Sequence, residues 1–112
     1  MLTDNIYRFI GLAMKAGKLT SGEQSCERII KSNKASLVIV SEDASSNTVK
    51  KFTDDCSYNG VHFLQFGDKE KLGKSIGKDI RSVIAITDEG FSQKLIELII
   101  ENKNKHGGGL IE

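Results

Sequence analysis

The sequence predicts an α/β protein, a three-layer α/β/α sandwich around a small mixed, mostly parallel sheet. The chain has 112 residues, the size of one ordinary domain. Segments with a helical period alternate along it with short apolar segments. Two of these, 35–40 and 83–87, are apolar at most positions, as strands are when helices cover both faces of their sheet. We expect a single domain over residues 1–105 and a flexible tail over 106–112.

The first helix is expected over residues 3–17. Apolar side chains recur there at the i, i+3, i+4, i+7 and i+8 spacing that buries one face of a helix. Thr3 is suited to cap its start and Gly17 to end it. The next three residues, 18–20, have the pattern of a very short strand.

A second helix follows and is expected to end near Asn33. Thr20 and Ser21 are each followed three residues later by Glu or Gln, which makes two overlapping capping boxes at its start. Cys26 lies on its apolar face, and Cys56 lies on the apolar face of the helix expected over 45–60. Two cysteines so far apart predict buried free thiols and not a disulfide framework or a zinc site.

The rest of the chain continues the alternation of strands and helices. Strands are expected over 35–40, 61–66 and 83–87, and helices over 45–60, over 69–76 and from 88 or 89 onward. Serines at 45 and 46 can cap the first of these helices, and Asn59-Gly60 can end it.

The net charge of +1 hides an uneven distribution. Residues 1–34 carry six basic groups against three acidic ones, and residues 61–82 carry five against three. The segments 35–60 and 83–112 each have a net charge of −2. If the fold brings the two basic segments together, they form a positive surface of the kind that nucleic acids bind.

Membrane and secretory proteins are not indicated. The longest apolar runs are far shorter than the roughly 18 residues that span a bilayer. The N-terminus carries Asp4 and lacks the basic start and apolar block of a secretion signal. We therefore expect a cytoplasmic protein with no membrane partner.

The start of the second helix is a candidate binding site. Gln24, Arg28 and Lys31 stack at i, i+4 and i+7 on its outward face. Gly22 leaves the N–H groups of the helix N-terminus open to an anion, and Lys18 precedes it. The surface could contact phosphates, and the amide of Gln24 could bond base edges. A merely solvated helix face has the same pattern, so the pattern alone leaves both interpretations open.

A second candidate is a carboxylate cluster. Glu42 and Asp43 follow one strand, and Asp88 and Glu89 follow another. Carboxyl ends of parallel strands meet at one edge of a sheet, where such a cluster could hold Mg²⁺. The alternative function is thus a small Mg²⁺-dependent phosphotransfer or phospho-acceptor protein that uses Asp43 and Asp88. Both acidic pairs also precede helices, and we favour the interpretation that they cap them.

Three stretches carry a family resemblance. In residues 17–28, Gly22 is followed six residues later by basic Arg28; in 37–43, an apolar strand is followed by Glu-Asp; and 72–77 reads Leu-Gly-x-x-x-Gly. Together they resemble the kink-turn RNA-binding ribosomal-protein family, which includes archaeal and eukaryotic large-subunit proteins and small bacterial members. The resemblance covers nearly the whole chain. It implies an α/β/α sandwich that binds RNA without catalysis, through the second helix and the loop before the last strand.

By position, Lys18, Gly22 and Arg28 match the family's binding residues. The recognition loop falls at 78–82, where the resemblance implies that Ile80 packs against an extruded base. Gln24-Ser25 replaces the Asn-Glu pair of the family, so an amide is kept and a carboxylate is lost. We therefore expect either a looser grip on a kink-turn or binding to a different structured RNA.

The sequence thus predicts a non-catalytic, bacterial, ribosomal-protein-like RNA-binding protein without cofactor or metal. The expected partners are structured RNA and the ribosome, and the expected state is a monomer. The candidate RNA-binding residues are Lys18, Thr20, Ser21, Gly22, Gln24, Ser25, Arg28, Lys31, Glu42, Asp43, Ile80, Arg81 and Ser82.

Overall fold

A computed structural model describes residues 2–106, and these residues form five helices and four strands. In chain order the elements are α1 (Leu2–Lys15), β1 (Leu19–Ser21), α2 (Glu23–Lys31), β2 (Leu37–Val40), α3 (Ser46–Asn59), β3 (His62–Gln65), α4 (Lys69–Ser75), β4 (Val83–Ile86) and α5 (Glu89–His106). This is the predicted order of helices and strands. Helix α5 includes residue 106, and the rest of the expected tail, 107–112, lies outside the described residues.

The strands form one mixed sheet in the order β1-β4-β2-β3. The expectation of a mostly parallel sheet is wrong: β2 and β3 are parallel, but β4 is antiparallel to both β1 and β2. The reason lies in the connection between β3 and β4. The Arg81 N–H donates to the Lys69 carbonyl, and the Lys78 N–H donates to that of Gly73. The chain thus folds back along α4 and enters β4 at the same end of the sheet where it left β3.

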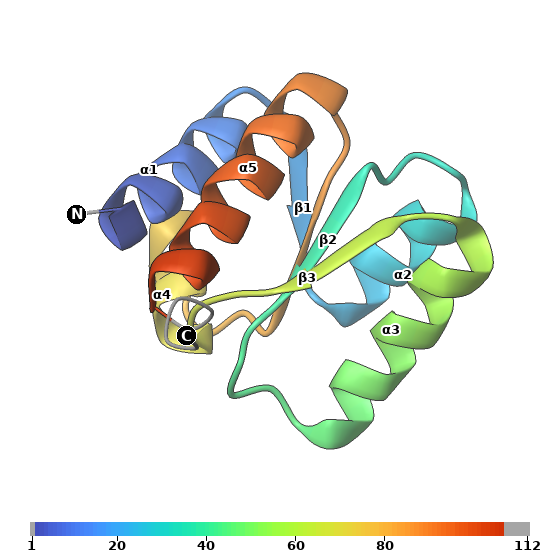
Figure 1. Cartoon of the computed structure of the whole chain (residues 1–112). Helices are drawn as coiled ribbons and strands as arrows, with labels where there is room; N and C mark the ends of the chain where they lie inside the picture. Colours follow the sequence, from blue (N-terminus) through green and yellow to red (C-terminus); the bar gives the residue numbers. More distant parts are fainter. Residues whose placement is uncertain (1, 107–112) are drawn as a thin grey trace.

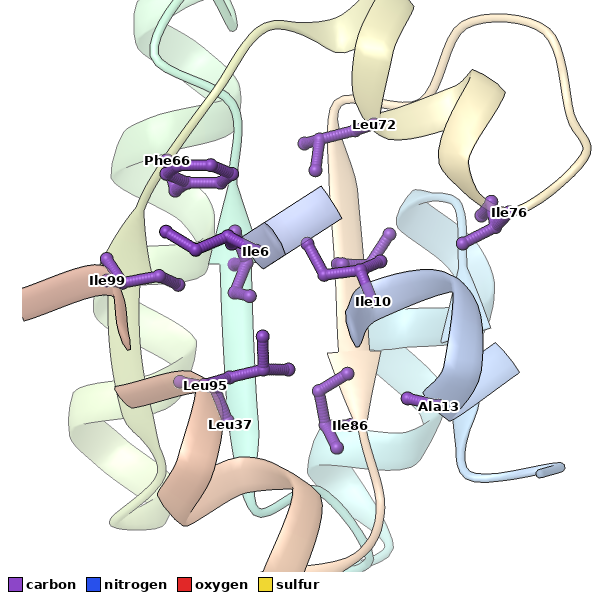
Figure 2. Packing of buried hydrophobic residues seen from close by; sticks show 12 residues of the cluster. Ile6, Ile10, Ala13, Leu37, Phe66, Leu72, Ile76, Ile86, Leu95 and Ile99 are labelled. Atoms are coloured by element: carbon purple, nitrogen blue, oxygen red, sulfur yellow. The ribbon is translucent and has the colours of Figure 1, made fainter. Parts of the chain in front are cut away.

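Helices cover both faces of the sheet, so the three-layer architecture is confirmed. Helices α1, α4 and α5 lie on one face, and α2 and α3 lie on the other (Figure 1). The two central strands are fully buried and send alternate side chains to each face, as a pleated strand must. Figure 2 shows the larger core, in which Ile6 and Ile10 of α1 pack with Leu95 and Ile99 of α5.

The smaller core lies under α2 and α3 and contains both cysteines. Cys26 and Cys56 are free and buried, as predicted. Burial raises the pKa of the Cys26 thiol to about 12 and that of Cys56 to about 11, because an apolar environment disfavours a thiolate. Both thiols are therefore inert at neutral pH.

The predicted caps of α2 and α3 have different outcomes. The hydroxyl of Ser45 accepts a hydrogen bond from the Thr48 N–H, so the predicted cap of α3 is confirmed. The two capping boxes at α2 are wrong: Thr20 and Ser21 pair in β1, and the N-cap is Gly22 without any side-chain cap. Strand pairing with β4 takes these two residues out of reach of the helix.

None of the helices within residues 2–106 combines the length and the apolar character that crossing a bilayer requires.

Candidate nucleic-acid interface

Three loops meet at one end of the sheet. Because β4 is antiparallel to β1 and β2, it begins where they end: Ser21 lies opposite Ile84, and Val40 lies opposite Val83. The start of α2, the turn after β2 and the loop before β4 are therefore neighbours. We call these segments, residues 21–25, 41–45 and 77–82, the loop end.

Hydrogen bonds tie the three segments together. The Arg81 Nε donates to the hydroxyl of Ser21 over 3.1 Å, and the Gly22 N–H donates to the Val83 carbonyl over 3.0 Å. The Ser41 N–H donates to the Ser82 carbonyl over 2.8 Å. The fold therefore brings the two basic segments of the sequence together.

The start of α2 is an open helix terminus. Gly22 has a φ of 95°, a left-handed conformation that favours glycine, and no side chain caps the start of the helix with a hydrogen bond. Gln24 is exposed beside it, and Ser25 is half-buried. The positive end of the helix dipole and these donors suit an anionic group.

The loop before β4 owes its path to Gly73. A Cβ on this buried glycine of α4 would overlap the Asp79 carbonyl, so only glycine lets the loop pass so close. The loop leaves the Ile80 side chain 52% exposed. Ile80 lines a cavity of about 640 Å³ together with three lysines and two acidic residues, Lys71, Lys74, Lys78, Glu70 and Asp79. An apolar side chain in a lining where lysines outnumber acidic residues matches a base joined to its phosphates.

The predicted basic residues of α2 differ in whether they form ion pairs. Arg28 is exposed and forms no ion pair within residues 2–106. Lys31 pairs with Glu27 over 2.8 Å, and Lys51 pairs with the other oxygen of the same carboxylate. Hydrogen bonds from Lys31 and Lys51 lower the pKa of Glu27 to about 2. Arg28 is thus the cation that a phosphate could engage without first breaking an ion pair.

Two predicted residues lie away from the loop end. Lys18 precedes β1, and its carbonyl accepts from the Thr87 N–H at the opposite end of the sheet. Thr20 lies in the middle of β1, opposite Ala85. The structure gathers Ser21, Gly22, Gln24, Ser25, Glu42, Asp43, Ile80, Arg81 and Ser82 at the loop end, with Arg28 and Lys31 further along α2.

The alternative of a cluster of four carboxylates is not realised. Glu42 and Asp43 follow β2 at the loop end, whereas Asp88 follows β4 at the opposite end, because these two strands are antiparallel. Within residues 2–106 no three metal-binding side chains come close enough to hold an ion. The Asp88 carboxylate accepts from the Phe91 N–H over 2.9 Å and caps α5, as the capping interpretation predicts.

Asp43 also serves a helix, although not the helix that follows it. Its carboxylate accepts from the Lys69 N–H over 3.1 Å, at the start of α4. Partial desolvation acts to raise the pKa of Asp43, but hydrogen bonds such as this one outweigh it and hold the pKa below its usual value. Asp43 therefore stays ionised and fixes α4 against the loop end.

Sequence reasoning missed Glu23, the first residue of α2. Its carboxylate accepts from the Thr48 hydroxyl over 2.9 Å, and that hydroxyl in turn accepts from Ser45 over 3.0 Å. Glu23 is thereby held beside Gln24. In the sequence it served only as a partner in a capping box, and no local pattern connects it with a threonine of the next helix.

The fold and the loop end define an α/β/α protein with an open binding surface made of a helix N-terminus and two loops. The chain belongs to the ribosomal protein L7Ae/L30e/S12e/Gadd45 family, whose model matches residues 4–96. The family predicted from the sequence motifs is thus confirmed.

Individual relatives agree with this assignment. The chain is 46% identical over 93 residues to RNA-binding protein YlxQ of Bacillus subtilis, covering 83% of this chain and 93% of that one. A solved protein of unknown function from Bacillus halodurans C superposes with a TM-score of 0.82 at 37% identity, over 85% of this chain and 96% of that one. The Giardia lamblia 15.5kD RNA binding protein shares the fold, with a TM-score of 0.72 at 18% identity, over 89% and 86% of the two chains.

Proposed function

We propose that this protein is a non-catalytic RNA-binding protein that recognises a structured, kink-turn-like RNA at its loop end. The observation that carries the proposal is the antiparallel entry of β4, which puts an open helix N-terminus beside a loop with an exposed Ile80. The family and the name of the Bacillus subtilis relative, an RNA-binding protein, support it.

Each part of the surface has a role in this proposal. The N–H groups at the start of α2 and the Arg28 guanidinium hold phosphates, which fix the RNA in register. Ile80 packs against an unstacked base, and Lys74 and Lys78 beside it neutralise the adjoining backbone. Arg81 is a positioning residue, because its bond to Ser21 holds the loop against β1.

Base recognition falls to Gln24 and Glu23. The Gln24 amide can donate to and accept from a base edge. Ser25 offers no carboxylate, but Glu23, held by Thr48, provides one at the adjoining position. An ionised carboxylate accepts hydrogen bonds from the amino and imino groups of guanine. Glu23 and Gln24 therefore offer together an amide and a carboxylate to the same RNA.

The proposal also covers cofactors, the source of the RNA and the oligomeric state. Contacts of this kind need neither a cofactor nor a metal, and ribosomal RNA in the cytoplasm is the expected source of a structured target. A single copy of the chain holds all the proposed contacts, so the protein acts as a monomer.

The test compares two RNAs across a salt series. Fluorescence anisotropy measures binding to a labelled kink-turn hairpin and to a plain duplex of equal length, with Lys94→Ala on α5 as a control for general charge loss. We expect the hairpin to bind at least about tenfold more tightly, a difference of about 1.4 kcal/mol. Equal affinity for both RNAs would reject kink-turn recognition, and binding to neither would reject RNA binding.

A further inference from the structure

A second polar cavity lies at the end of the sheet opposite the loop end. It has a volume of about 610 Å³, is open to solvent, and is lined by the start of β1, the end of α2 with the residues after it, and the residue that follows β4. Leu19 and Ile29 form an apolar part of its lining. A cavity of this size is within the range of sites that hold small organic groups.

The polar lining has unused hydrogen-bonding capacity. Thr20, Asn33, Ser36 and Thr87 line the cavity, and none of their side chains makes a hydrogen bond to another part of residues 2–106. Three hydroxyls and one amide can both donate and accept, which is what reading the edge of a base requires. These groups are therefore available to a ligand.

The charge of the cavity lining is positive. Lys34 is in its lining, and Lys18 and Asp88 are next to the lining residues Leu19 and Thr87. Neither lysine forms an ion pair within the described part of the chain, and no lining residue is acidic. Apolar walls, base-reading groups and a free ammonium together match a nucleotide with its phosphate.

Helix α2 connects the cavity with the loop end. Its nine residues run from Glu23 to Lys31, with Arg28 exposed between the two sites. At about 1.5 Å per residue the helix is about 13.5 Å long, which about four stacked nucleotides would span. An RNA held at the loop end can therefore continue along α2 to the cavity.

We propose that this cavity is a second RNA subsite, which takes one unpaired nucleotide of a strand that extends from the RNA bound at the loop end. The base packs against Leu19 and Ile29, the free hydroxyls and the Asn33 amide bond its edge, and Lys34 contacts its phosphate. This inference rests on the proposed RNA binding.

The experiment adds single-stranded tails to the kink-turn hairpin. Hairpins with zero, four or eight unpaired uridines on either strand are titrated with wild-type protein and with the double variant Lys34→Gln/Asn33→Gly. Asn33 has a φ of 61°, so glycine keeps the backbone conformation while removing the side-chain amide.

We expect a tail of four or more nucleotides on one strand to tighten binding to the wild type about tenfold, as added hydrogen bonds and one phosphate contact would. The double variant should lose most of that gain. Its affinity for the hairpin that has no tail should equal that of the wild type.

Lys94→Gln, a matched charge loss on α5, should keep the whole gain. Equal affinity of wild-type protein for hairpins with and without tails would overturn the second subsite and leave the loop end intact, as would a gain that the double variant keeps. No binding to any hairpin would reject the proposed function itself. Thermal unfolding of both variants checks that the fold persists.

Discussion

The Arg81 guanidinium donates from Nε to the hydroxyl of Ser21, a bond of 3.1 Å between residues 60 positions apart in the chain. This bond joins the loop before β4 to the strand that leads into α2. It therefore connects the two parts of the proposed interface directly, and Ser21→Ala removes it without changing Gly22, the N-cap of α2, or Ile80.

Ser21→Ala should weaken RNA binding. Loss of a partly exposed hydrogen bond costs about 0.5–1.5 kcal/mol, and the released loop must then be ordered by the RNA. We expect binding to the kink-turn hairpin to fall about threefold to tenfold. A double-mutant cycle with Arg81→Ala measures whether the two residues act together. Additive losses in affinity would show that the bond does not position the loop.

Gly73→Ala should destabilise the protein. The new methyl group would overlap the Asp79 carbonyl, which is backbone and cannot rotate away. Overpacking of a buried position costs about 1–3 kcal/mol, and here the loop that carries Ile80 must also move. The urea concentration at the unfolding midpoint should be lower than for the wild-type protein, and the affinity for RNA should fall as well.

Gly90→Ala is the matched control for Gly73→Ala. Gly90 lies in the first turn of α5, and a Cβ there would meet only the Asp88 side chain, at 3.3 Å. Alanine should therefore change stability by no more than about 1 kcal/mol, because its preference for a helix offsets the small shift required of the Asp88 carboxylate that caps α5. An unfolding midpoint of Gly73→Ala equal to that of Gly90→Ala would contradict the role assigned to Gly73.

The sequence predicts the elements of this fold well, because each depends on a local pattern. The period of the apolar residues in α1 and the continuous burial of β2 and β4 are both properties of short windows. The direction of β4 is different. It depends on hydrogen bonds such as that between Arg81 and Lys69, which no local pattern shows, and the expected mostly parallel sheet was wrong for that reason.

The same distinction applies to the site. Gly22, Gln24 and Ile80 could be found because the family motifs mark their positions. Glu23 could not, since its place depends on a hydroxyl 25 residues away in α3. The alternative of a carboxylate cluster fails on topology: Asp43 and Asp88 would share an edge only if their strands were parallel.

Arg28→Ala should reduce the salt dependence of RNA binding. Removing one contact between a cationic side chain and a phosphate lowers the slope of log K against log salt by about one. Arg28 has no ion pair to break within residues 2–106, so its full charge is available to a phosphate. Anisotropy titrations at several salt concentrations give the slope.

Lys31→Ala is the comparison for Arg28→Ala on the same helix. Lys31 already pairs with Glu27 over 2.8 Å, so its contact with a phosphate competes with that pair. We expect a smaller change in slope than for Arg28→Ala. An unchanged slope for Arg28→Ala would remove that residue from the interface.

Protonation of the Glu27 carboxylate at low pH should lower the stability of the protein, because it weakens the contact between α2 and α3. Hydrogen bonds from Lys31 and Lys51 hold its pKa at about 2, against about 4.3 for an unperturbed glutamate. A depressed folded-state pKa contributes stability that is fully present above about pH 4.3 and is lost as the pH falls toward 2. NMR titration of the Glu27 carboxyl carbon should show the low midpoint.

Lys51→Ala should raise the midpoint of the Glu27 titration, because one of the two hydrogen bonds is removed. Lys50→Ala is the control and should leave it unchanged, since Lys50 pairs with Asp54 over 2.9 Å. Equal midpoints in the Lys51→Ala and Lys50→Ala variants would show that the contact between α2 and α3 does not hold the charge of Glu27.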